Sequence, residues 1–479
     1  MTPAERAFAR TMARLAVCNH FLPERIELER EALGPAFEDS PAVAWNLDSD
    51  SGGRSPNIVR LTEKTAGVLG KLRGRFRKGG RLSGEEVEGY EALVFYHLYQ
   101  HYRSEFQSLT LTPQAATRVV KCYGTFCEDA ERLLRPALEA GLERQENAHL
   151  FAGLWQIERA FINIFQNIIG SSRSIVRLRA TVWESIFTCN FKRYREGLYK
   201  GMSQITTLIT GPSGTGKELV ARAIACSGYI PFDANRQTFA SDARSLLYAL
   251  SLSALPLSLI ESELFGHKRG AFTGALADHA GWLEACPKDG SVFLDEIGEI
   301  EASLQVKLLR VLQTRTFQRL GESRSRRFEG KIIAATNRDL VAEIEAGRFR
   351  EDFYYRICAD VLSAPSLREQ LAEAPGDLKR LVCFITRRLV SPEQTEELTE
   401  EVVRVVATEL GSDYGWPGNF RELEQCVRNV LVRGRYNPAQ IKPREPAAAL
   451  AADIAAGRLT AEELLQRYCA VIYRQTHNL

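Results

Sequence analysis

The sequence predicts a central α/β domain with a parallel sheet, placed between two regions that are mostly helical. From about residue 168 to Pro365, short apolar runs that end in Gly-rich or acidic turns alternate with amphipathic stretches. This alternation is typical of parallel strands joined by helices. On both sides of the segment, apolar residues recur at spacings of three and four, which indicates amphipathic helices. The candidate strands are residues 206–209, 291–294 and 331–335.

The composition is that of a soluble globular protein. The chain has 479 residues, with 45% apolar and 25% charged residues, enough for roughly two to four domains. Its net charge of +2 is close to neutral, so any contact with DNA must come from a local patch. The ten cysteines do not have the spacing of metal ligands, and no apolar run approaches the length of a membrane span. We expect a cytoplasmic protein with free thiols and no membrane contact.

The first 165 residues contain no internal repeat and no catalytic signature. A basic run over residues 71–81, broken by glycines, favours a solvated loop over a phosphate-binding arm. His97 and His101 have the i, i+4 spacing of metal ligands, but no third ligand is evident. A helix packed through its aromatic side chains is the favoured interpretation of that segment.

A short heptad pattern covers residues 150–168, where apolar residues alternate by four and three. It spans about two and a half repeats, fewer than an independent coiled coil needs. Two interpretations stay open. The segment is either a linker helix that pairs protomers, which would give a resting dimer, or a helix that packs against its own domain.

A glycine-rich segment follows the strand predicted at 206–209 and precedes a predicted helix at 219–225. In such a turn the backbone N–H groups close around phosphates, the helix N-terminus adds its positive dipole, and a lysine contacts the β- and γ-phosphates. The general motif has Ser or Thr after the lysine, where this chain has a glutamate. The predicted phosphate-binding residues are Gly211, Ser213, Gly214, Thr215, Gly216, Lys217 and Glu218.

Acidic and polar residues end the next two predicted strands. Asp295 and Glu296 close the second strand, where Asp295 would hold Mg²⁺ and Glu296 would polarise the attacking water. Thr336 and Asn337 close the third, where a polar side chain would sense the γ-phosphate. A lone strand that ends in Asp-Glu is more often structural. The order of phosphate loop, acidic strand and polar strand tip nevertheless favours a nucleotide-hydrolysing site.

Two motifs between the phosphate loop and the acidic strand are more specific. Glu261-Ser-Glu-Leu-Phe-Gly-His267 and Gly270-Ala-Phe-Thr-Gly-Ala275 resemble the signature of bacterial enhancer-binding proteins, the AAA+ activators of sigma-54 RNA polymerase. In that family the second hexapeptide tips a loop that touches sigma-54. Here Phe272 is an apolar knob, and the flanking glycines permit a tight, mobile tip. The resemblance implies a partner-binding loop made of Gly270, Ala271, Phe272, Thr273, Gly274 and Ala275.

Further segments resemble the same family over residues 168–435. The family carries a glutamate after the phosphate-loop lysine, as this chain does. Ile169 and Gly170 match the start of the domain, near the adenine pocket, and Arg421 matches the sensor II position of the helical lid.

Two arginines also match. Arg350 and Arg356 resemble the arginine fingers that reach the γ-phosphate held by a neighbouring subunit. The resemblance thus implies an AAA+ P-loop ATPase that uses ATP and Mg²⁺ and works as a ring, expected to be a hexamer.

The chain departs from the family pattern between the phosphate loop and the signature motif. Residues 226–250 are longer than in the family, and a second insertion lies around residues 191–201. Ser251 stands where the family usually has an asparagine, which is thought to hold the catalytic glutamate until the target is engaged. Because serine is shorter, we expect that this switch does not work in the usual way.

The C-terminal stretch opens with Thr460 and Glu463, a capping box at the head of one amphipathic helix. This helix resembles the first helix of the helix-turn-helix found in family members. The turn and the recognition helix that would enter the major groove are missing. Either the chain is truncated, or it activates without specific DNA contacts of its own.

We therefore predict an α/β AAA+ P-loop ATPase domain with an α-helical lid, preceded by a mostly α-helical regulatory domain. The predicted boundaries are 1–165 for the regulatory domain, 166–364 for the α/β subdomain, 365–436 for the lid, 437–458 for a linker and 459–479 for the C-terminal helix.

The predicted function is ATP-driven remodelling of sigma-54 RNA polymerase closed complexes, which opens the promoter. Expected partners are the sigma-54 holoenzyme, further copies of this chain and, if the helix-turn-helix is completed, promoter or enhancer DNA. Two alternatives stay open: an AAA+ motor with another protein target, and a non-hydrolysing, nucleotide-dependent scaffold. Only Ser251 supports the scaffold.

Overall fold

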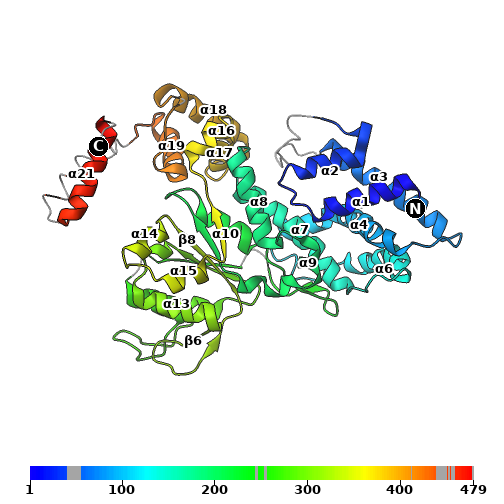
Figure 1. The fold of residues 1–479 in the computed structure, drawn as a ribbon, viewed down its shortest axis with the longest axis horizontal. Helices are drawn as coiled ribbons and strands as arrows, with labels where there is room; N and C mark the ends of the chain where they lie inside the picture. The colour runs from blue at the N-terminus through cyan, green and yellow to red at the C-terminus, as the bar shows by residue number, and fades with distance from the viewer. Residues whose placement is uncertain are drawn as a thin grey trace.

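A computed structural model describes residues 1–39, 55–242, 246–252, 256–411, 413–438, 450, 454 and 459–476. Its centre is a parallel sheet, with a helical region on its N-terminal side and a smaller helical subdomain above the sheet (Figure 1). This arrangement confirms the predicted fold class. No helix in the described ranges is long and apolar enough to cross a membrane.

The N-terminal region consists of amphipathic helices around one core, and its first and fourth helices begin with capping boxes, Thr2 with Glu5 and Ser83 with Glu86. The helices are α1 (Pro3–Val17), α2 (Glu24–Leu33), η1 (Gly34–Ala36), α3 (Pro56–Phe76), α4 (Gly84–His101), α5 (Arg103–Leu111), α6 (Tyr123–Glu139) and α7 (Asn147–Asn167).

Helix α3 corrects one expectation. It extends to Phe76, so the first half of the basic run over residues 71–81 is helical and not a loop. Lysine and arginine are good helix formers, and Leu69 and Leu72 anchor the buried face of the same turns. Arg75 forms an ion pair with Glu5 of α1.

The heptad pattern belongs to α7 and the residue after it, and its apolar side chains pack within this chain, four of them buried and two, Ile157 and Phe161, half-buried. Leu150 and Leu154 join the N-terminal core, whereas Ile164 and Ile168 join the core beneath the sheet. Of the two interpretations, packing against its own chain is the one found here. The seam therefore gives no reason to expect a resting dimer.

Three helices lead from α7 into the sheet: α8 (Arg173–Phe187), followed by the short α9 (Phe191–Glu196) and η3 (Leu198–Gln204). The insertion at residues 191–201 thus forms α9 and part of η3. Arg195 of α9 forms an ion pair with Glu91 of α4 at 2.8 Å, and its guanidinium lies over the ring of Phe95 at 4.2 Å. This segment is packed against the N-terminal region.

All five strands of the sheet are parallel, in the order β4-β5-β8-β1-β9. They are β1 (Thr207–Thr210), β4 (Leu247–Ser251), β5 (Ser291–Asp295), β8 (Lys331–Thr336) and β9 (Asp360–Ser363). The three predicted strands are the three central ones. The sheet's helices are α10 (Lys217–Ala225), α11 (Leu257–Phe265), α12 (Trp282–Ala285), η5 (Ile297–Glu299), α13 (Ala302–Thr314), α14 (Leu340–Glu345) and α15 (Glu351–Ile357).

Two small hairpins extend from this framework: β2 (Phe232–Asp233) with β3 (Thr238–Phe239), and β6 (Thr316–Phe317) with β7 (Arg326–Arg327). The first lies in the long segment at 226–250. Its side chains Phe232 and Phe239 are buried in the N-terminal core, where Phe239 packs on Trp155 with ring centroids 3.8 Å apart. The insertion therefore attaches the α/β domain to the N-terminal region.

The helical subdomain after Pro365 contains α16 (Leu367–Glu373), α17 (Asp377–Thr386), α18 (Pro392–Glu409) and α19 (Asn419–Arg433) around a core of its own. Near the C-terminus, α21 (Ala461–Thr476) follows the predicted capping box. The N–H of Thr460 donates to Glu463 at 2.9 Å, and the N–H of Glu463 donates to the Thr460 hydroxyl at 3.3 Å.

Candidate nucleotide-binding site

The phosphate loop lies between β1 and α10, and its conformation requires glycine. The backbone φ is +141° at Gly211, +78° at Gly214 and +81° at Gly216. A Cβ on Gly211 would lie 2.5 Å from the carbonyl oxygen of Ala364, and one on Gly214 would lie 2.5 Å from that of Gly418. Both the left-handed backbone and the close approach exclude larger residues.

Lys217 is the first residue of α10, and its side chain folds across the loop. Its Nζ donates to the carbonyl oxygens of Gly211 and Pro212, both at 2.9 Å. Burial lowers the pKa of Lys217, and the nearby Asp295 carboxylate partly opposes this effect. The ammonium group therefore lies where a phosphate would be held, between the loop and the acidic strand.

Two other polar side chains of the loop, those of Thr215 and Glu218, differ in exposure. Thr215 is buried, and its hydroxyl donates to the Pro212 carbonyl at 3.0 Å. Glu218 is exposed and lies 3.4 Å from Arg222, one turn further along α10. Glu218 thus faces away from the turn, which is compatible with a glutamate at this position.

Asp295 ends β5 at the same edge of the sheet. Its Oδ1 accepts a hydrogen bond from the N–H of Glu296 at 3.0 Å. Burial raises the pKa of Asp295, and the Glu296 hydrogen bond and the Lys217 charge act against this rise. Glu296 itself has a φ of +60°, a left-handed conformation that is uncommon outside glycine. Such strain at an acidic residue is frequent in functional sites.

The neighbouring strand ends complete this edge. Thr336 at the end of β8 is buried and aligned with Thr210 of β1, and its hydroxyl accepts from the N–H of Arg338 at 3.0 Å. The next residue, Asn337, is exposed. On the other side, Ser251 of β4 is aligned with Asp295. The structure thus brings Lys217 and the predicted strand-tip residues to one edge.

The lid contacts the phosphate loop directly. The Nδ2 of Asn419 donates to the Ser213 carbonyl at 2.9 Å, and the N–H of Phe420 donates to the Gly214 carbonyl at 2.9 Å. Arg421 places Nη1 at 3.3 Å from the Ser213 hydroxyl. The predicted role of Arg421 is compatible with this position. The sequence did not predict the hydrogen bond made by Asn419, although Asn419 lies only two residues before Arg421.

The start of the domain is also held by the lid. Gly170 has a φ of +131°, and a Cβ there would lie 2.1 Å from the Gln370 amide nitrogen. Asp377 accepts hydrogen bonds from the N–H and the hydroxyl of Ser171, each at 2.7 Å, and Gln370 donates to the carbonyl of Ile169 at 3.0 Å. Gln370 and Asp377 were missed because only the fold brings them to this segment.

The two predicted arginine fingers lie at α15. Arg350 precedes the helix, and its guanidinium is held by Asp352 at 2.8 and 3.0 Å. Arg356 lies in the last turn, and both side chains are exposed. Tyr355 between them is 70% exposed. This face is therefore open to contact by another molecule.

The predicted partner-binding loop is a tight turn beyond α11. The N–H of Gly270 donates to the Ala275 carbonyl at 2.9 Å, and the N–H of Ala275 donates to that of Phe272 at 3.0 Å. Phe272 is half-buried, with its ring 5.0 Å from that of His267 in an edge-on arrangement. Thr273 is exposed, and Leu276, just after the hexapeptide, is 85% exposed.

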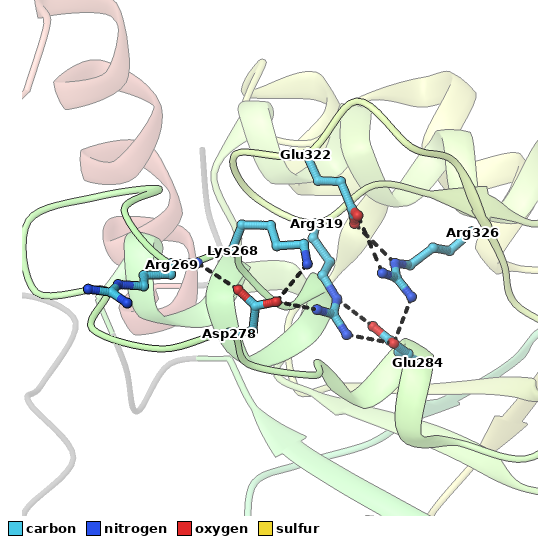
Figure 2. Close-up of polar contacts among 7 residues, drawn as sticks. All are labelled: Lys268, Arg269, Asp278, Glu284, Arg319, Glu322 and Arg326. Atoms are coloured by element: carbon cyan, nitrogen blue, oxygen red, sulfur yellow. Dashed lines mark hydrogen bonds and ion pairs between the residues drawn. The ribbon is translucent and has the colours of Figure 1, made fainter.

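Charged residues fix both ends of this loop (Figure 2). Asp278 accepts from the Nζ of Lys268 at 2.6 Å and from the N–H of Arg269 at 2.9 Å. Arg319 donates to both carboxylate oxygens of Glu284, at 2.7 and 2.6 Å. Arg319 follows β6, and its Nη1 also lies 3.9 Å from Asp278, so the loop is tied to the β6–β7 hairpin. None of these charges was singled out from the sequence.

His97 and His101 are the pair whose spacing is that of metal ligands. The rings of His97 and His101 stack with centroids 6.1 Å apart, and burial lowers the pKa of His97. The described residues contain no group of three or more His, Cys, Asp or Glu that could hold a metal ion.

Comparison with known families decides what kind of domain carries this site. The family described as "Sigma-54 interaction domain" matches residues 192–362. The chain contains a sigma-54 interaction domain. This domain includes the phosphate loop, the acidic strand, the hexapeptide loop and both arginines, whereas helices α1 to α8 and the whole lid lie outside the matched residues.

Curated relatives of the sigma-54 interaction domain are transcription regulators. The chain is 39% identical over 281 residues to the anaerobic nitric oxide reductase transcription regulator NorR of Citrobacter koseri, covering 57% of this chain and 50% of NorR. It is 42% identical over 230 residues to the Nif-specific regulatory protein of Azotobacter vinelandii, covering 47% and 40%. It is 43% identical over 228 residues to HoxA of Bradyrhizobium diazoefficiens, covering 48% and 43%. The chain thus spans half or less of the length of each of these relatives.

Among solved structures, NtrX from Brucella abortus in complex with ADP is 23% identical and covers 71% of this chain and 74% of NtrX. Its TM-score of 0.41 is too low to support an argument about this chain.

Proposed function

We propose that this chain is an ATP-hydrolysing activator of sigma-54 RNA polymerase. The observation that carries the proposal is the meeting of three elements at one sheet edge: Lys217 on the phosphate loop, Asp295 and Glu296 at the end of β5, and Arg421 of the lid. All but the lid residue belong to the sigma-54 interaction domain, which also carries the hexapeptide loop.

The residues have separate roles in this proposal. The loop N–H groups and Lys217 bind the phosphates, and Arg421 lies over the same loop, where it closes the site. Glu296 orients a water for attack on the γ-phosphate, and Thr336 with Asn337 completes the polar strand tips. Ile169 and Gly170, fixed by the lid, border the base of the nucleotide.

Mg²⁺ fits the donor set. A magnesium site in a nucleotide hydrolase commonly uses one or two carboxylates together with the phosphates of the substrate. Burial raises the pKa of Asp295, so a cation at its carboxylate would offset the cost of keeping that group charged. When bound, Mg²⁺ would neutralise charge on the phosphates, with Asp295 as its protein ligand.

Ring assembly would complete the site. Arg350 just before α15 and Arg356 in its last turn are exposed, so they are available to a nucleotide held by a neighbouring copy of this chain. Hydrolysis would then move the hexapeptide loop through the charged residues at its base, and Phe272 would act on sigma-54 in the cytoplasm. A hexamer is the proposed assembly, and contact with promoter DNA would require further residues.

The test is steady-state ATPase activity of the full chain against protein concentration, with Lys217→Ala as the inactive control. We expect turnover per subunit to rise steeply with concentration, because the arginines come from the neighbouring subunit. In addition, ATP-dependent binding to sigma-54 would distinguish this function from an AAA+ motor with another target. ATP binding without turnover at any concentration would instead support a non-hydrolysing scaffold.

A further inference from the structure

Helix α7 of the N-terminal region caps the far end of the phosphate-loop helix α10. Gln156 donates to the Ser227 carbonyl at 2.9 Å, and Asn163 donates to the Cys226 carbonyl at 3.0 Å. Between them, the guanidinium of Arg159 donates to the Gly228 carbonyl. Since the residues at a helix C-terminus have carbonyls without intrahelical partners, these side chains satisfy groups that would otherwise be buried and unpaired.

Arg159 is the unusual member of this group. Its side chain is fully buried and lies over the Trp155 ring at 4.3 Å, and burial lowers its pKa to about 10. Its Nε and Nη1 have no acceptor in the described part of the chain. Among the described residues no carboxylate forms an ion pair with this guanidinium, although the charge of Asp289 acts on it. A buried guanidinium without an ion pair destabilises a fold. A role in stability alone therefore does not explain this residue.

The neighbour of Arg159 across the α10 end is the turn that starts β5. A Cβ on Gly228 would lie 3.9 Å from the Asp289 carbonyl oxygen, and Asp289 is two residues before Ser291, the first residue of β5. The Oδ2 of Asp289 is buried and also has no donor among the described residues. Arg159 thus lies near the end of α10 that is remote from Lys217 and near the start of β5, which is remote from Asp295.

Trp155 of α7 and the segment between α5 and α6 hold the part of the chain that connects α10 to β4. Phe239 packs on Trp155, the N–H of Val120 donates to the Gln237 carbonyl at 2.8 Å, and the N–H of Phe239 donates to the Ala116 carbonyl at 2.9 Å. The chain that leaves α10 is therefore fixed by the N-terminal region before it returns to the sheet.

We propose that Arg159 is a positioning residue for nucleotide hydrolysis, an inference that rests on the proposed ATPase function. Lys217 begins α10 and Asp295 ends β5, whereas Gly228 and Asp289 lie at the opposite ends of these elements. A helix and a strand move as rigid units. Fixing Gly228 beside Asp289 therefore sets the spacing of Lys217 and Asp295 across the site.

The decisive variant is Arg159→Met, which keeps the length of the side chain and removes its charge and donors. We expect kcat to fall about tenfold, because small displacements of catalytic groups cost this much or more. The thermal unfolding midpoint should change little, because the removal of a buried charge without an ion pair offsets the loss of the hydrogen bond to the Gly228 carbonyl. A residue that only stabilises the fold would give the opposite pattern, a lower midpoint with unchanged kcat per folded molecule.

Arg103→Met is the matched control. Arg103 also contacts α7, through Glu158 at 3.1 Å, but the Glu158 carboxylate accepts its other hydrogen bonds from Tyr99 of α4 and Gln107 of α5. Its loss leaves the buried Glu158 carboxylate without its ion pair, so the unfolding midpoint should fall. Its kcat should equal that of the wild type. An equal fall of kcat in both variants would overturn the assignment to Arg159.

Arg159→Lys gives a second readout. The charged and titratable groups that face this position are Cys226, Tyr194 and Asp289, and burial raises the pKa of Cys226 and of Tyr194, so both stay neutral near pH 7. A lysine has a lower ordinary pKa than arginine and would lose its proton at a lower pH in the same buried place. The activity of this variant relative to wild type should therefore fall as the pH rises from about 7 to about 9.

The outcomes separate the two proposals. A wild-type chain that binds ATP without turnover would remove the proposed ATPase function, and the role of Arg159 would then be judged by the Kd for ATP. Wild-type turnover, or a wild-type Kd in the absence of turnover, for Arg159→Met would overturn the positioning role.

Discussion

Ser251 and Asp295 occupy aligned positions at the ends of the neighbouring parallel strands β4 and β5. The N–H of Leu252 donates to the Asp295 carbonyl at 3.2 Å, which fixes this alignment. Ser251 therefore lies beside the acidic pair, at the position where the resemblance expects an asparagine, and its hydroxyl reaches less far than an amide would.

The first prediction concerns this position. Ser251→Asn should lower basal ATPase activity about tenfold, because an amide of longer reach can hold the Glu296 carboxylate in an unproductive position through a hydrogen bond to a charged group. Adding sigma-54 should restore part of the activity. The measurement is turnover with and without sigma-54, and Ser251→Ala is the control. An asparagine variant as active as the alanine variant would show that no such switch can be built here.

Glu296→Gln tests the proposed role of the acidic pair. The amide keeps the size of the side chain but is a poor base, so kcat should fall at least about a hundredfold. Binding of ATP should remain, because Lys217 and the loop are intact. The control is Glu301→Gln, an exposed residue before α13. If Glu296→Gln kept wild-type turnover, the water-activating group would have to be another residue.

The central strands could be predicted from the sequence because β1, β5 and β8 are apolar runs buried almost throughout. The edge strands β4 and β9 were not predicted because they are not buried apolar runs. Each has exposed and half-buried positions over four or five residues, which gives little hydrophobic pattern to detect. Strands β2 and β3, of two residues each, have no periodicity at all.

The residues of the nucleotide site also fall into two groups, those that the sequence predicts and those that it does not. Lys217, Asp295 and the glycines of the loop belong to local motifs, so residue types and spacing were enough to find them. Other contacts of the site are hydrogen bonds to residues about 200 positions away in the chain. They are made by Asp377, Gln370 and Asn419. Contacts of this kind depend on tertiary packing, and a single sequence contains no local signal for them.

Asn419→Ala should weaken ATP binding through the lid. Asn419 has a φ of +51°, its Nδ2 donates to the Ser213 carbonyl, and its Oδ1 accepts from the N–H of Leu367 at 2.9 Å. Losing both bonds and straining the backbone should cost about 2 kcal/mol, or roughly thirtyfold in the Kd for ATP. Asn419→Gly removes the backbone strain, because glycine adopts a positive φ freely, but it still lacks the two side-chain hydrogen bonds. If the glycine variant bound ATP like wild type, the hydrogen bonds would not matter.

Phe239→Ala should destabilise the whole chain, because this ring of the β2–β3 hairpin is buried in the N-terminal core. Removing a buried phenylalanine costs about 3–5 kcal/mol. Urea unfolding measures the change, and Val119→Ala, at a side chain that is 63% exposed, should have almost no effect. A small effect of Phe239→Ala would mean that the hairpin and the N-terminal region unfold independently.

The last prediction concerns the face that would contact sigma-54. Phe272 is half-buried against His267, so Phe272→Ala would remove a contact and also loosen the loop. Leu276 is 85% exposed, so Leu276→Ser should leave stability and ATPase activity unchanged. Burial of a leucine in a complex is worth about 1.5 kcal/mol or more, so the Kd for sigma-54 should rise roughly tenfold. The control is Leu389→Ser, at a lid residue that is 42% exposed. Equal Kd values for both variants would restrict the contact to the hexapeptide itself, since Leu276 would then contribute nothing to the interface.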